Sequence, residues 1–586
     1  MKTHIKPKKQ IKIDFIMNEP QILNQEPQNV QKGHPKGLYV LFTTEMWERF
    51  NFYGMRALLT LFLVNALAFS DKDASIVYGG FLGLSYLTPM LGGYVADRYL
   101  GNRNCIILGG MVMGIGQLFL FFSGYIYTTD IDIAKLAMWV ALATVIIGNG
   151  FFKPNISSMV GQLYNKGDSR LDSAFTIFYM GINVGAFLGM SVCPFLGDVK
   201  VGDIRVVEAF KWGFLAASMA MFLGTGLFIL LKNKYVRSPE GYPVGAKPEF
   251  SSTEVQNKTE EAEKANFTRG SIIASILLLG VLYIVFHFLS LDPNPIKSWV
   301  YPFIYASALS LAFLILTDKS ITKVERDRII VMYIIAFFVI FFWSAFEQAG
   351  SSLTFVADKQ TDLNFLGFQL PPSFIQNANS IFIVVFALPF SWLWLKLQKR
   401  NLEPISPVKQ AIGLLLLAIG YYIIAVQIAK IGSTGKLAVH WLFIMYLFHT
   451  LGELCLSPIG LSLVSKLAPK RFSSLLMGVW FIGNAAGYAL AGTLGALIPA
   501  TGDKFEFAAS KGIDLQAVLD GTVKPTAEQV AILAQEKIDI VYPTFVGFTV
   551  HNLYEFFMVF VTLSGTAAIV LFLISGILKK MMHGVR

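Results

Sequence analysis

The sequence predicts an all-α membrane protein with fourteen transmembrane helices. Of its 586 residues, 54% are hydrophobic and only 15% are charged, whereas about a quarter of a soluble domain is charged. Apolar runs of about 20 residues, the length at which a helix crosses a bilayer, recur along the chain. Strands of a membrane barrel are alternating segments of only about ten residues, so helices are favoured. The spans are expected to begin near Gly37, Ser75, Cys105, Lys135, Asp172, Trp212, Ser271, Ser298, Ile329, Ser373, Val408, Leu437, Ser473 and His551.

The loop charges support an even number of spans. Basic residues recur in every second loop: Arg98, Arg103, Lys166, Arg170, Lys232, Lys234, Arg237, Lys319, Lys323, Arg326, Arg328, Lys399, Arg400, Lys470, Arg471, Lys579 and Lys580. The intervening loops include acidic ones at 71–73 and 130–132, while those near 200–205 and 430–436 are mixed. Because positive loops stay in the cytoplasm, both termini are expected there. The net charge of +10 is thus explained by topology, and no nucleic-acid partner is expected.

The spans group into two halves. We expect a disordered cytoplasmic tail over 1–36, a six-helix bundle over 37–235, a polar cytoplasmic linker over 236–270, two extra helices over 271–320 and a second six-helix bundle over 321–586. The extra helices carry few ionisable residues, which favours a peripheral position. An external insertion covers 500–548, in which Thr526 and Gln529 form the pattern of a capping box. Transporters built from two such halves place their substrate between them near the bilayer midplane.

The first span carries charges that are costly in a membrane, at about 2.5–3.5 kcal/mol each. At about 100° per residue, one arc of about 140° collects Glu45, Glu48, Arg49, Phe52, Tyr53 and Arg56. Such a face must line water or polar groups rather than lipid. The alternative is a self-neutralising pair of Glu45 and Arg49 at i,i+4 spacing with no further role.

Three motifs resemble the proton-coupled oligopeptide transporter family of the major facilitator superfamily. Residues 45–53, ExxERFxFY, resemble its ExxERFxYY motif, with Phe52 in place of the first tyrosine. Residues 178–185, FYMGINVG, resemble its FYxxINxG motif, and residues 148–155, GNGFFKPN, its fourth-helix motif. The loop over 92–103 is similar to one found across the superfamily. The resemblance implies the superfamily fold, with two six-helix bundles and two extra helices, and proton-coupled import of di- and tripeptides.

The resemblance also implies the site residues. Those expected to couple protons are Glu45, Glu48, Arg49, Lys153 and Glu347. Those expected to bind peptide are Arg49, Tyr53, Arg56, Tyr86, Lys153, Tyr179, Asn183, Glu347, Asn379, Glu453, Ser457 and Trp480. Lys153 could instead extend to the membrane surface, and Glu347 and Glu453 could be structural pairs. Asn379 is followed by Ser380, where the family has proline.

A mechanism follows from these charges. The three cations Arg49, Arg56 and Lys153 would hold a peptide carboxylate, and Glu453 its amine. Glu45 and Glu48 would accept protons with Lys153 as their switching partner. Glu347 would pair with a cation of the first half, such as Arg56, on the outer side, and Glu453 with Lys153 on the inner side. No metal or cofactor other than the proton is expected, and the protein is expected to be a monomer in the cytoplasmic (inner) membrane.

Three other functions stay open. The first is transport of another small solute within the same family, such as nitrate or an amino-acid conjugate. A drug exporter of the superfamily is disfavoured by the matched motifs. A membrane enzyme or receptor is disfavoured because no nucleotide loop, metal-ligand cluster or nucleophile motif stands out in the sequence.

Overall fold

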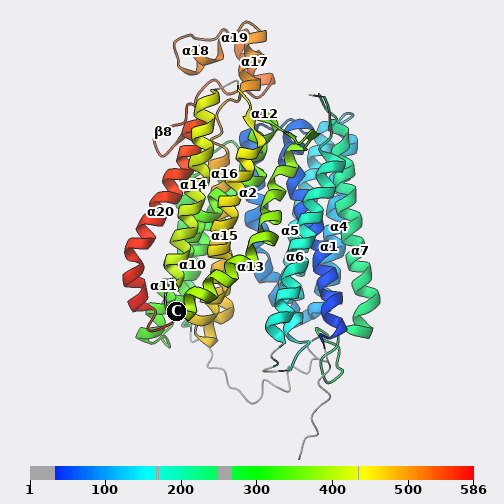
Figure 1. Cartoon of the computed structure of the whole chain (residues 1–586), viewed down its shortest axis with the longest axis vertical. Helices are drawn as coiled ribbons and strands as arrows, with labels where there is room; N and C mark the ends of the chain where they lie inside the picture. The colour runs from blue at the N-terminus through cyan, green and yellow to red at the C-terminus, as the bar shows by residue number, and fades with distance from the viewer. Residues whose placement is uncertain are drawn as a thin grey trace, which may run out of the picture.

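The computed structural model describes residues 33–165, 168, 170–202, 204–247, 267–432 and 435–585. Residues 1–32 of the tail predicted over 1–36, residues 248–266 of the linker predicted over 236–270, Lys166 and the side chains of Ser457 and Lys470 lie outside these described residues. The N-terminal half consists of α1 (Lys36–Asn65), α2 (Asp71–Leu87), α3 (Pro89–Val95), α4 (Asn102–Ile126), α5 (Ile131–Gly161), α6 (Leu171–Gly197) and α7 (Phe210–Tyr235) (Figure 1).

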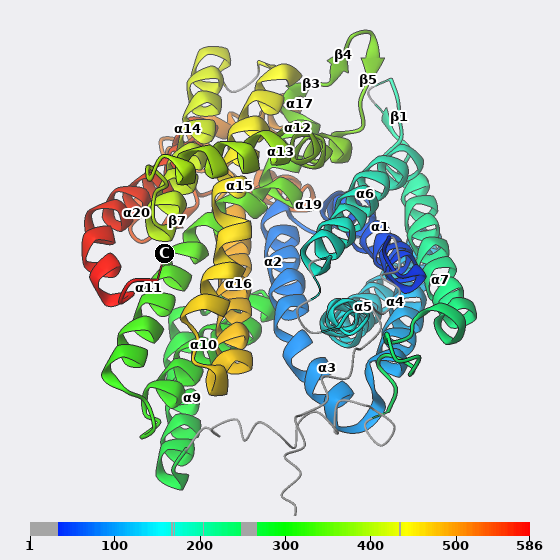
Figure 2. The same cartoon turned by 60° about the horizontal axis from the view of Figure 1, so that its bottom comes forward.

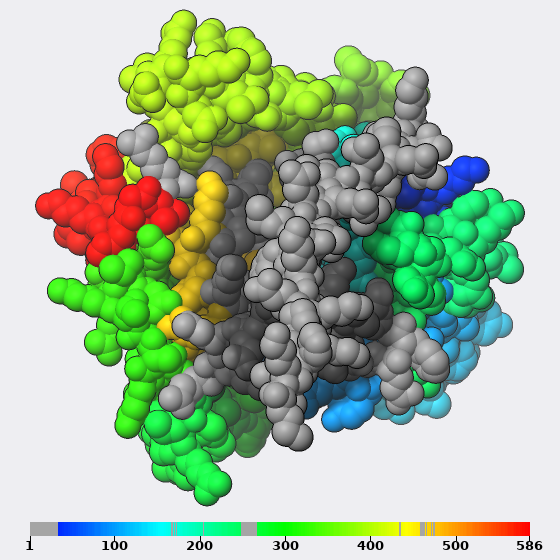
Figure 3. Space-filling model, turned by 90° about the horizontal axis from the view of Figure 1, so that it is seen from below, coloured from blue at the N-terminus to red at the C-terminus, as the bar shows by residue number. Residues whose placement is uncertain are grey.

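The C-terminal half packs beside it. Its membrane helices are α11 (Lys323–Phe346), which continues into α12 (Ser352–Lys359), and α13 (Ala378–Lys399), α14 (Ser406–Ile431), α15 (Val439–Leu467), α16 (Ser473–Gly495) and α20 (Leu553–Met581). α1 begins and α20 ends at the same end of the molecule, which we call the lower end, as in Figure 1. The opposite, upper end carries the insertion helices α17 (Gly502–Ser510), α18 (Leu515–Leu519) and α19 (Ala527–Gln535). Figure 3 views the lower face, where the two halves lie side by side.

The count of spans agrees with the prediction of fourteen. Thirteen helical segments of the described chain are long and apolar enough to cross a membrane. The fourteenth is α1, which has 30 residues and packs against α6 and α7. It is not among the thirteen because its four charged residues between Glu45 and Arg56 make it less apolar. The largest offset between a predicted and an observed start is at α11, which begins at Lys323 rather than Ile329.

The two extra helices lie at the edge of the C-terminal half, as predicted. α9 (Arg269–Leu289) exposes most of its surface, while α10 (Tyr301–Leu316) packs against α9 and α16. The Tyr301 hydroxyl donates to the Ile76 carbonyl oxygen at 2.8 Å, which ties this hairpin to α2.

Short strands and the capped insertion complete the fold. The two-residue strands form the pairs β1 (Lys200–Val201) with β2 (Ile204–Arg205), β3 (Thr361–Asp362) with β6 (Leu437–Ala438), β4 (Asn364–Phe365) with β5 (Phe368–Gln369), and β7 (Thr544–Phe545) with β8 (Phe548–Thr549). Only β3 and β6 are parallel. Thr526 and Gln529 form the predicted capping box of α19.

Part of the predicted linker belongs to the N-terminal half. Val236 and Val244 are buried, and Arg103 donates to the backbone carbonyl oxygens of both. The prediction that 236–270 is one polar linker is therefore wrong for 236–247. The sequence does not indicate this packing, because two buried valines among polar residues form no periodic pattern. Arg103 of α4 thereby binds the segment that follows α7 at the lower end.

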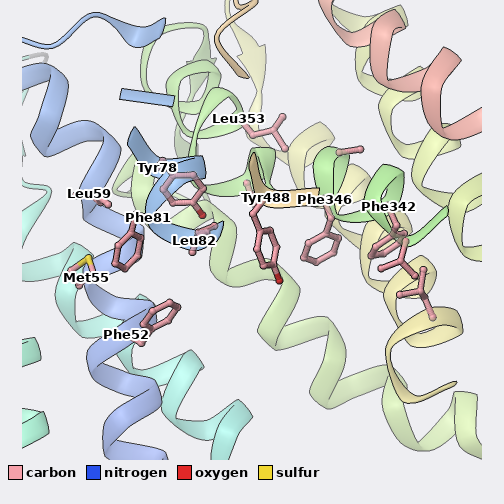
Figure 4. Packing of buried hydrophobic residues seen from close by; sticks show 14 of the residues in the cluster. Phe52, Met55, Leu59, Tyr78, Phe81, Leu82, Phe342, Phe346, Leu353 and Tyr488 are labelled. Atoms are coloured by element: carbon pink, nitrogen blue, oxygen red, sulfur yellow. The ribbon is translucent and has the colours of Figure 1, made fainter. Parts of the chain in front are cut away.

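The two halves meet through α2 and α16 (Figure 2). Gly79 and Gly492 lie so close that a Cβ on Gly79 would come within 2.7 Å of the Gly492 Cα. Aromatic side chains fill the region around this contact. Phe52 and Phe81 stack on one side, with ring centroids 5.7 Å apart, and Tyr488 lies across from them (Figure 4).

A glycine stripe brings α6 against α1. Gly181, Gly185 and Gly189 recur every fourth residue and so share one face of α6. A Cβ on Gly185 would lie 2.1 Å from the Met46 carbonyl oxygen, and a Cβ on Gly189 would lie 2.4 Å from that of Phe50. Membrane helices approach closely where small residues allow it. The glycine of the FYxxINxG motif therefore has a packing reason, because it seats α6 on the charged segment of α1.

Gly185→Val should destabilise the protein by more than about 3 kcal/mol, because the methyl groups would meet backbone that cannot move without separating α6 from α1. The measurement is the unfolding temperature and the yield of monodisperse protein. Gly226→Val in α7, where a Cβ meets nothing within 4 Å, is the matched control. Equal behaviour of the two variants would contradict the packing role.

Candidate functional site

The α1 charges form a buried cluster. Glu45, Glu48 and Arg49 are all buried. Arg49 Nε lies 2.9 Å from Glu45 Oε1 and 2.5 Å from Glu48 Oε2. The alternative pair of Glu45 and Arg49 is therefore present, but a single guanidinium serves two carboxylates. The trio keeps one uncompensated negative charge, which a proton or a further cation must balance.

Lys153 is placed to be that cation. It lies on α5 and interacts electrostatically with Glu45, Glu48 and Arg49. Its Nζ atom sits 3.6 Å from the centroid of the Tyr86 ring, a cation–π arrangement. The side chain is thus held inside the protein, which contradicts the alternative of an extension to the membrane surface.

A second ion pair links the halves above this cluster. Arg56 Nη1 donates to both carboxylate oxygens of Glu347 at 3.1 Å, as predicted. The Tyr78 hydroxyl donates to Glu347 Oε2 at 3.2 Å, and Arg56 also lies over the Tyr53 ring at 5.0 Å. Three helices, α1, α2 and α11, therefore converge on one carboxylate that ends α11.

More polar contacts between the halves lie nearer the upper end. Arg205 binds Asp198 at 2.7 Å within its own half and Asp358 of the other half at 2.9 Å. Lys200 also reaches Asp358, at 2.7 Å. Asp198 in turn accepts from the Ser373 hydroxyl at 2.7 Å. Because Asp198 sits between Arg205 and Ser373, this network fastens the β1–β2 hairpin to α12 and to the segment before α13.

A third contact closes the upper end beside α2. Asp71 receives Lys359 at 3.0 Å and Lys504 at 2.7 Å. Lys504 belongs to the insertion helix α17, so the insertion takes part in joining the halves. Together the three groups of contacts close the space between the halves toward the upper end.

The C-terminal half carries a further carboxylate, Glu453 on α15, near the Arg56–Glu347 pair. Asn379 Nδ2 donates to Glu453 Oε2 at 2.9 Å and to Thr450 Oγ1 at 3.1 Å. Glu453 interacts electrostatically with Arg56 and Glu347. This carboxylate therefore lies near Arg56 of the other half, and an amide from α13 holds its orientation.

The space below Glu453 is open. Tyr179 on α6 interacts electrostatically with Glu453 on α15, yet its side chain is 48% exposed. Asn183, one turn further along, donates to the Tyr179 carbonyl oxygen at 2.9 Å. The exposure of Tyr179 contrasts with the buried side chains that join the halves at the upper end.

Two expectations about the site, one about a residue pair and one about a single residue, differ from the structure. The predicted ion pair between Lys153 and Glu453 is absent among the described residues: Lys153 lies over the Tyr86 ring, and Glu453 accepts from Asn379. Trp480 is buried in the main apolar cluster, so its side chain offers little surface to a solute in this arrangement. Phe52, the departure from the motif, packs on Phe81 and needs no hydroxyl partner there.

The residues that close the upper end could not be predicted from the sequence. Tyr78, Asp198, Asp358 and Lys504 each join the halves, but none belongs to a motif or a periodic pattern. Only Asp71 stood in an acidic loop that was noticed for topology. Such contacts join residues more than 150 positions apart, so local patterns carry no signal for them.

The site combines a buried acid–base cluster in one half with a carboxylate in the other. The described residues contain no group of three or more His, Cys, Asp or Glu side chains that could hold a metal ion. What the arrangement can do is bind a solute of mixed charge and exchange protons with buried carboxylates. It offers no nucleophile beside a base for covalent chemistry.

Comparisons with known proteins agree with this arrangement. The family model PTR2, described as the POT family, matches residues 103–506. An uncharacterized transporter of Bacillus subtilis, YclF, is 35% identical over 480 residues, which cover 80% of this chain and 89% of that protein. The peptide transporter YePEPT of Yersinia enterocolitica is 32% identical over 481 residues, with the same coverage.

The fold comparison gives the same result. The crystal structure of a POT family transporter in complex with 5-aminolevulinic acid matches with a TM-score of 0.70 and 28% identity, over 94% of this chain and 98% of that one. The resemblance read from the motifs is confirmed. The chain belongs to the POT family, whose members are transporters rather than enzymes.

Proposed function

We propose that this protein imports di- and tripeptides together with protons by alternating access. The observation that carries the proposal is the placement of a buried, net-negative cluster on α1 beside Lys153, with Glu453 of the other half near Arg56. The relatives include a protein named as a peptide transporter. We further propose that the lower end faces the cytoplasm of a bacterial inner membrane, with both termini there, and that the protein acts as a monomer.

The chemistry of a peptide fits the charges. A zwitterionic peptide has a fixed amine and a fixed carboxylate, while its side chains vary. Arg49, Arg56 and Lys153 supply positive charge for the carboxylate, and Glu453 supplies negative charge for the amine. Aromatic rings such as that of Tyr179 give contact that tolerates many side chains. The site would then hold the two ends and leave the middle free.

Proton coupling follows from the imbalance in the α1 cluster. Protonation of Glu48 or Glu45 would leave Arg49 with a single carboxylate partner and remove the negative charge that attracts Lys153. A buried charge without a partner is costly, so protonation would bias the equilibrium between the two accessible states. Lys153 would then be free to bind the peptide carboxylate.

A second candidate is a small solute that also carries both an amine and a carboxylate. It is favoured by the similar structure that binds 5-aminolevulinic acid. Nitrate fits less well, because it has no amine to pair with Glu453. For a peptide, for such a solute and for nitrate alike, the cations of the site would bind the negatively charged group.

The deciding experiment is uptake of a labelled dipeptide by sealed liposomes that contain the protein, with an imposed proton gradient. We expect accumulation that other di- and tripeptides inhibit and that nitrate leaves unchanged. Uptake of labelled 5-aminolevulinic acid without uptake of the labelled dipeptide would support the second candidate. Accumulation that is the same without the proton gradient would overturn the coupling.

Glu453→Gln should weaken dipeptide affinity by about tenfold to a hundredfold, since it removes a charge-assisted contact worth about 1.5–3 kcal/mol. An N-acetylated dipeptide has no charged amine and should bind both proteins equally. The measurement is competition against labelled dipeptide uptake, with Glu536→Gln on the exposed surface of the insertion as the control. An equal loss of affinity for free and acetylated peptides would show that Glu453 does not recognise the amine.

A further inference from the structure

A crevice of about 880 Å³ opens beside the extra helices, away from the site between the halves. Its walls come from α9, α10, α11 and α16, and the segment 539–546 of the insertion covers its upper end. The walls are mainly apolar and include Tyr305, Leu309, Phe337, Ile340, Ala486 and Leu490. A volume of this size holds a ligand rather than a single water.

The crevice runs along the membrane normal. Lys297 lies at its upper end and Leu309 lower on the same hairpin arm, twelve positions apart, which corresponds to about 18 Å along a helix. One leaflet of the hydrocarbon core is about 15 Å thick, half of the bilayer value. The crevice therefore has the length of an extended acyl chain.

The side of the crevice faces lipid. Phe337 is 54% exposed and Leu309 is 50% exposed, although both lie on membrane-spanning helices. At the upper end, the exposed Val541 and Val546 add apolar surface where the membrane meets solvent. A lipid of the upper leaflet can thus enter from the side, which a water-soluble ligand could not do.

The mouth carries a defined set of charges. Asp292 binds Lys297 at 2.9 Å and Lys72 at 3.5 Å. Burial raises the pKa of Asp292, but the Asn294 backbone N–H and Lys297 lower it by more, so its pKa lies below the ordinary value and the carboxylate stays charged. Two lysines against one aspartate leave a surplus positive charge. An anionic group can use that surplus.

Asp539 adds a separate negative charge. It also lines the crevice, is exposed, and has no ion-pair or hydrogen-bond partner among the described residues. A ligand head that carries a negative and a positive group would satisfy both sides of the mouth. An anionic head alone would leave Asp539 unpaired beside a second negative charge.

We propose that this crevice binds a phospholipid with a zwitterionic, amine-bearing head group, phosphatidylethanolamine. One acyl chain lies along α10 and α16, the phosphate meets Lys72 and Lys297, and the amine meets Asp539. Lys72 belongs to α2 of the N-terminal half, whereas Lys297 precedes α10. The bound lipid therefore joins the halves at the upper end, beside the hydrogen bond from Asn294 to Asp73 at 2.8 Å.

The test is native mass spectrometry of the purified full-length protein, equilibrated with equal amounts of phosphatidylethanolamine and phosphatidylglycerol of identical chains. We expect one retained phosphatidylethanolamine, favoured at least tenfold over phosphatidylglycerol. Ala308→Phe, which fills the crevice wall, should abolish retention. Val281→Phe on the exposed face of α9 is its matched control and should retain the lipid.

The charges are tested separately. Asp539→Asn should remove the preference for phosphatidylethanolamine while a lipid is still retained, and Lys72→Gln with Lys297→Gln should lose both lipids. Lys524→Gln, exposed on the insertion, should behave as wild type. Equal retention of the two lipids by wild type, preference for phosphatidylglycerol, or unchanged retention in a well-folded Ala308→Phe variant would each overturn the proposal. If Ala308→Phe does not fold, the Asp539→Asn result decides.

Discussion

Glu48→Gln should abolish uphill peptide accumulation while peptide exchange across the membrane continues. A proton driving force of about 200 mV is worth about 4.6 kcal/mol, enough for about thousandfold accumulation with one proton per peptide. Glutamine cannot take up that proton, and it also gives Arg49 one charged partner instead of two. The protein would then be held in the charge state that protonation normally produces, so it could cycle with peptide but not couple to protons.

The measurement separates coupling from binding. Liposomes with the variant are compared in two assays, concentrative uptake under a proton gradient and counterflow of labelled peptide without one. We expect accumulation to fall to the equilibrium level and counterflow to persist. Glu536→Gln, exposed in the insertion, should match wild type in both assays. Undiminished accumulation by Glu48→Gln would exclude Glu48 as the proton acceptor.

Glu347→Gln should open the upper end. Arg56 and Glu347 are buried and bonded at 3.1 Å, and loss of one partner from such a pair costs about 3–5 kcal/mol because the other charge stays buried without a counterion. The substitution therefore destabilises the conformation in which the halves are in contact at the upper end. A bias of about 3 kcal/mol shifts a two-state equilibrium by more than a hundredfold.

A cysteine at a closed position measures the shift. Thr60 is buried and donates to the Gly350 carbonyl oxygen across the halves at 2.9 Å, and the three native cysteines are buried. A Thr60→Cys protein should resist a membrane-impermeant thiol reagent applied at the upper end, and Glu347→Gln should make that cysteine reactive. Glu325→Gln, which breaks a pair with Arg471 inside one half, is the control. Labelling that Glu347→Gln leaves unchanged would contradict a role of this pair in closure.

Much of the fold could be predicted because the bilayer constrains it locally. Length and apolarity of each run located the helices within six residues, and the charged face of α1 followed from helical periodicity. Arg56 with Glu347 could be paired from the family resemblance before any distance was known. The four-residue spacing of Gly181, Gly185 and Gly189 is also visible in the sequence, and it indicates the close packing of α6 on α1.

The remaining contacts depend on how the two halves meet. Asp198 with Arg205 and Asp358, Asp71 with Lys504, and the crevice beside α10 each join segments that no local pattern connects. The separation of Lys153 from Glu453 also depends on this geometry, because the same residues could pair if the halves closed at the lower end.

By itself, the sequence determined that this protein is a helical membrane transporter of the POT family with ionisable side chains inside its first span. The physical reason is that a bilayer imposes length, apolarity and charge rules on each helix separately. Only the tertiary structure decided that one arginine serves two glutamates, that Tyr78 completes the Arg56–Glu347 pair, and that the upper end is closed while Tyr179 stays open. Those features are set by the packing of helices far apart in the chain, where glycine contacts and buried ion pairs fix distances that no single segment encodes.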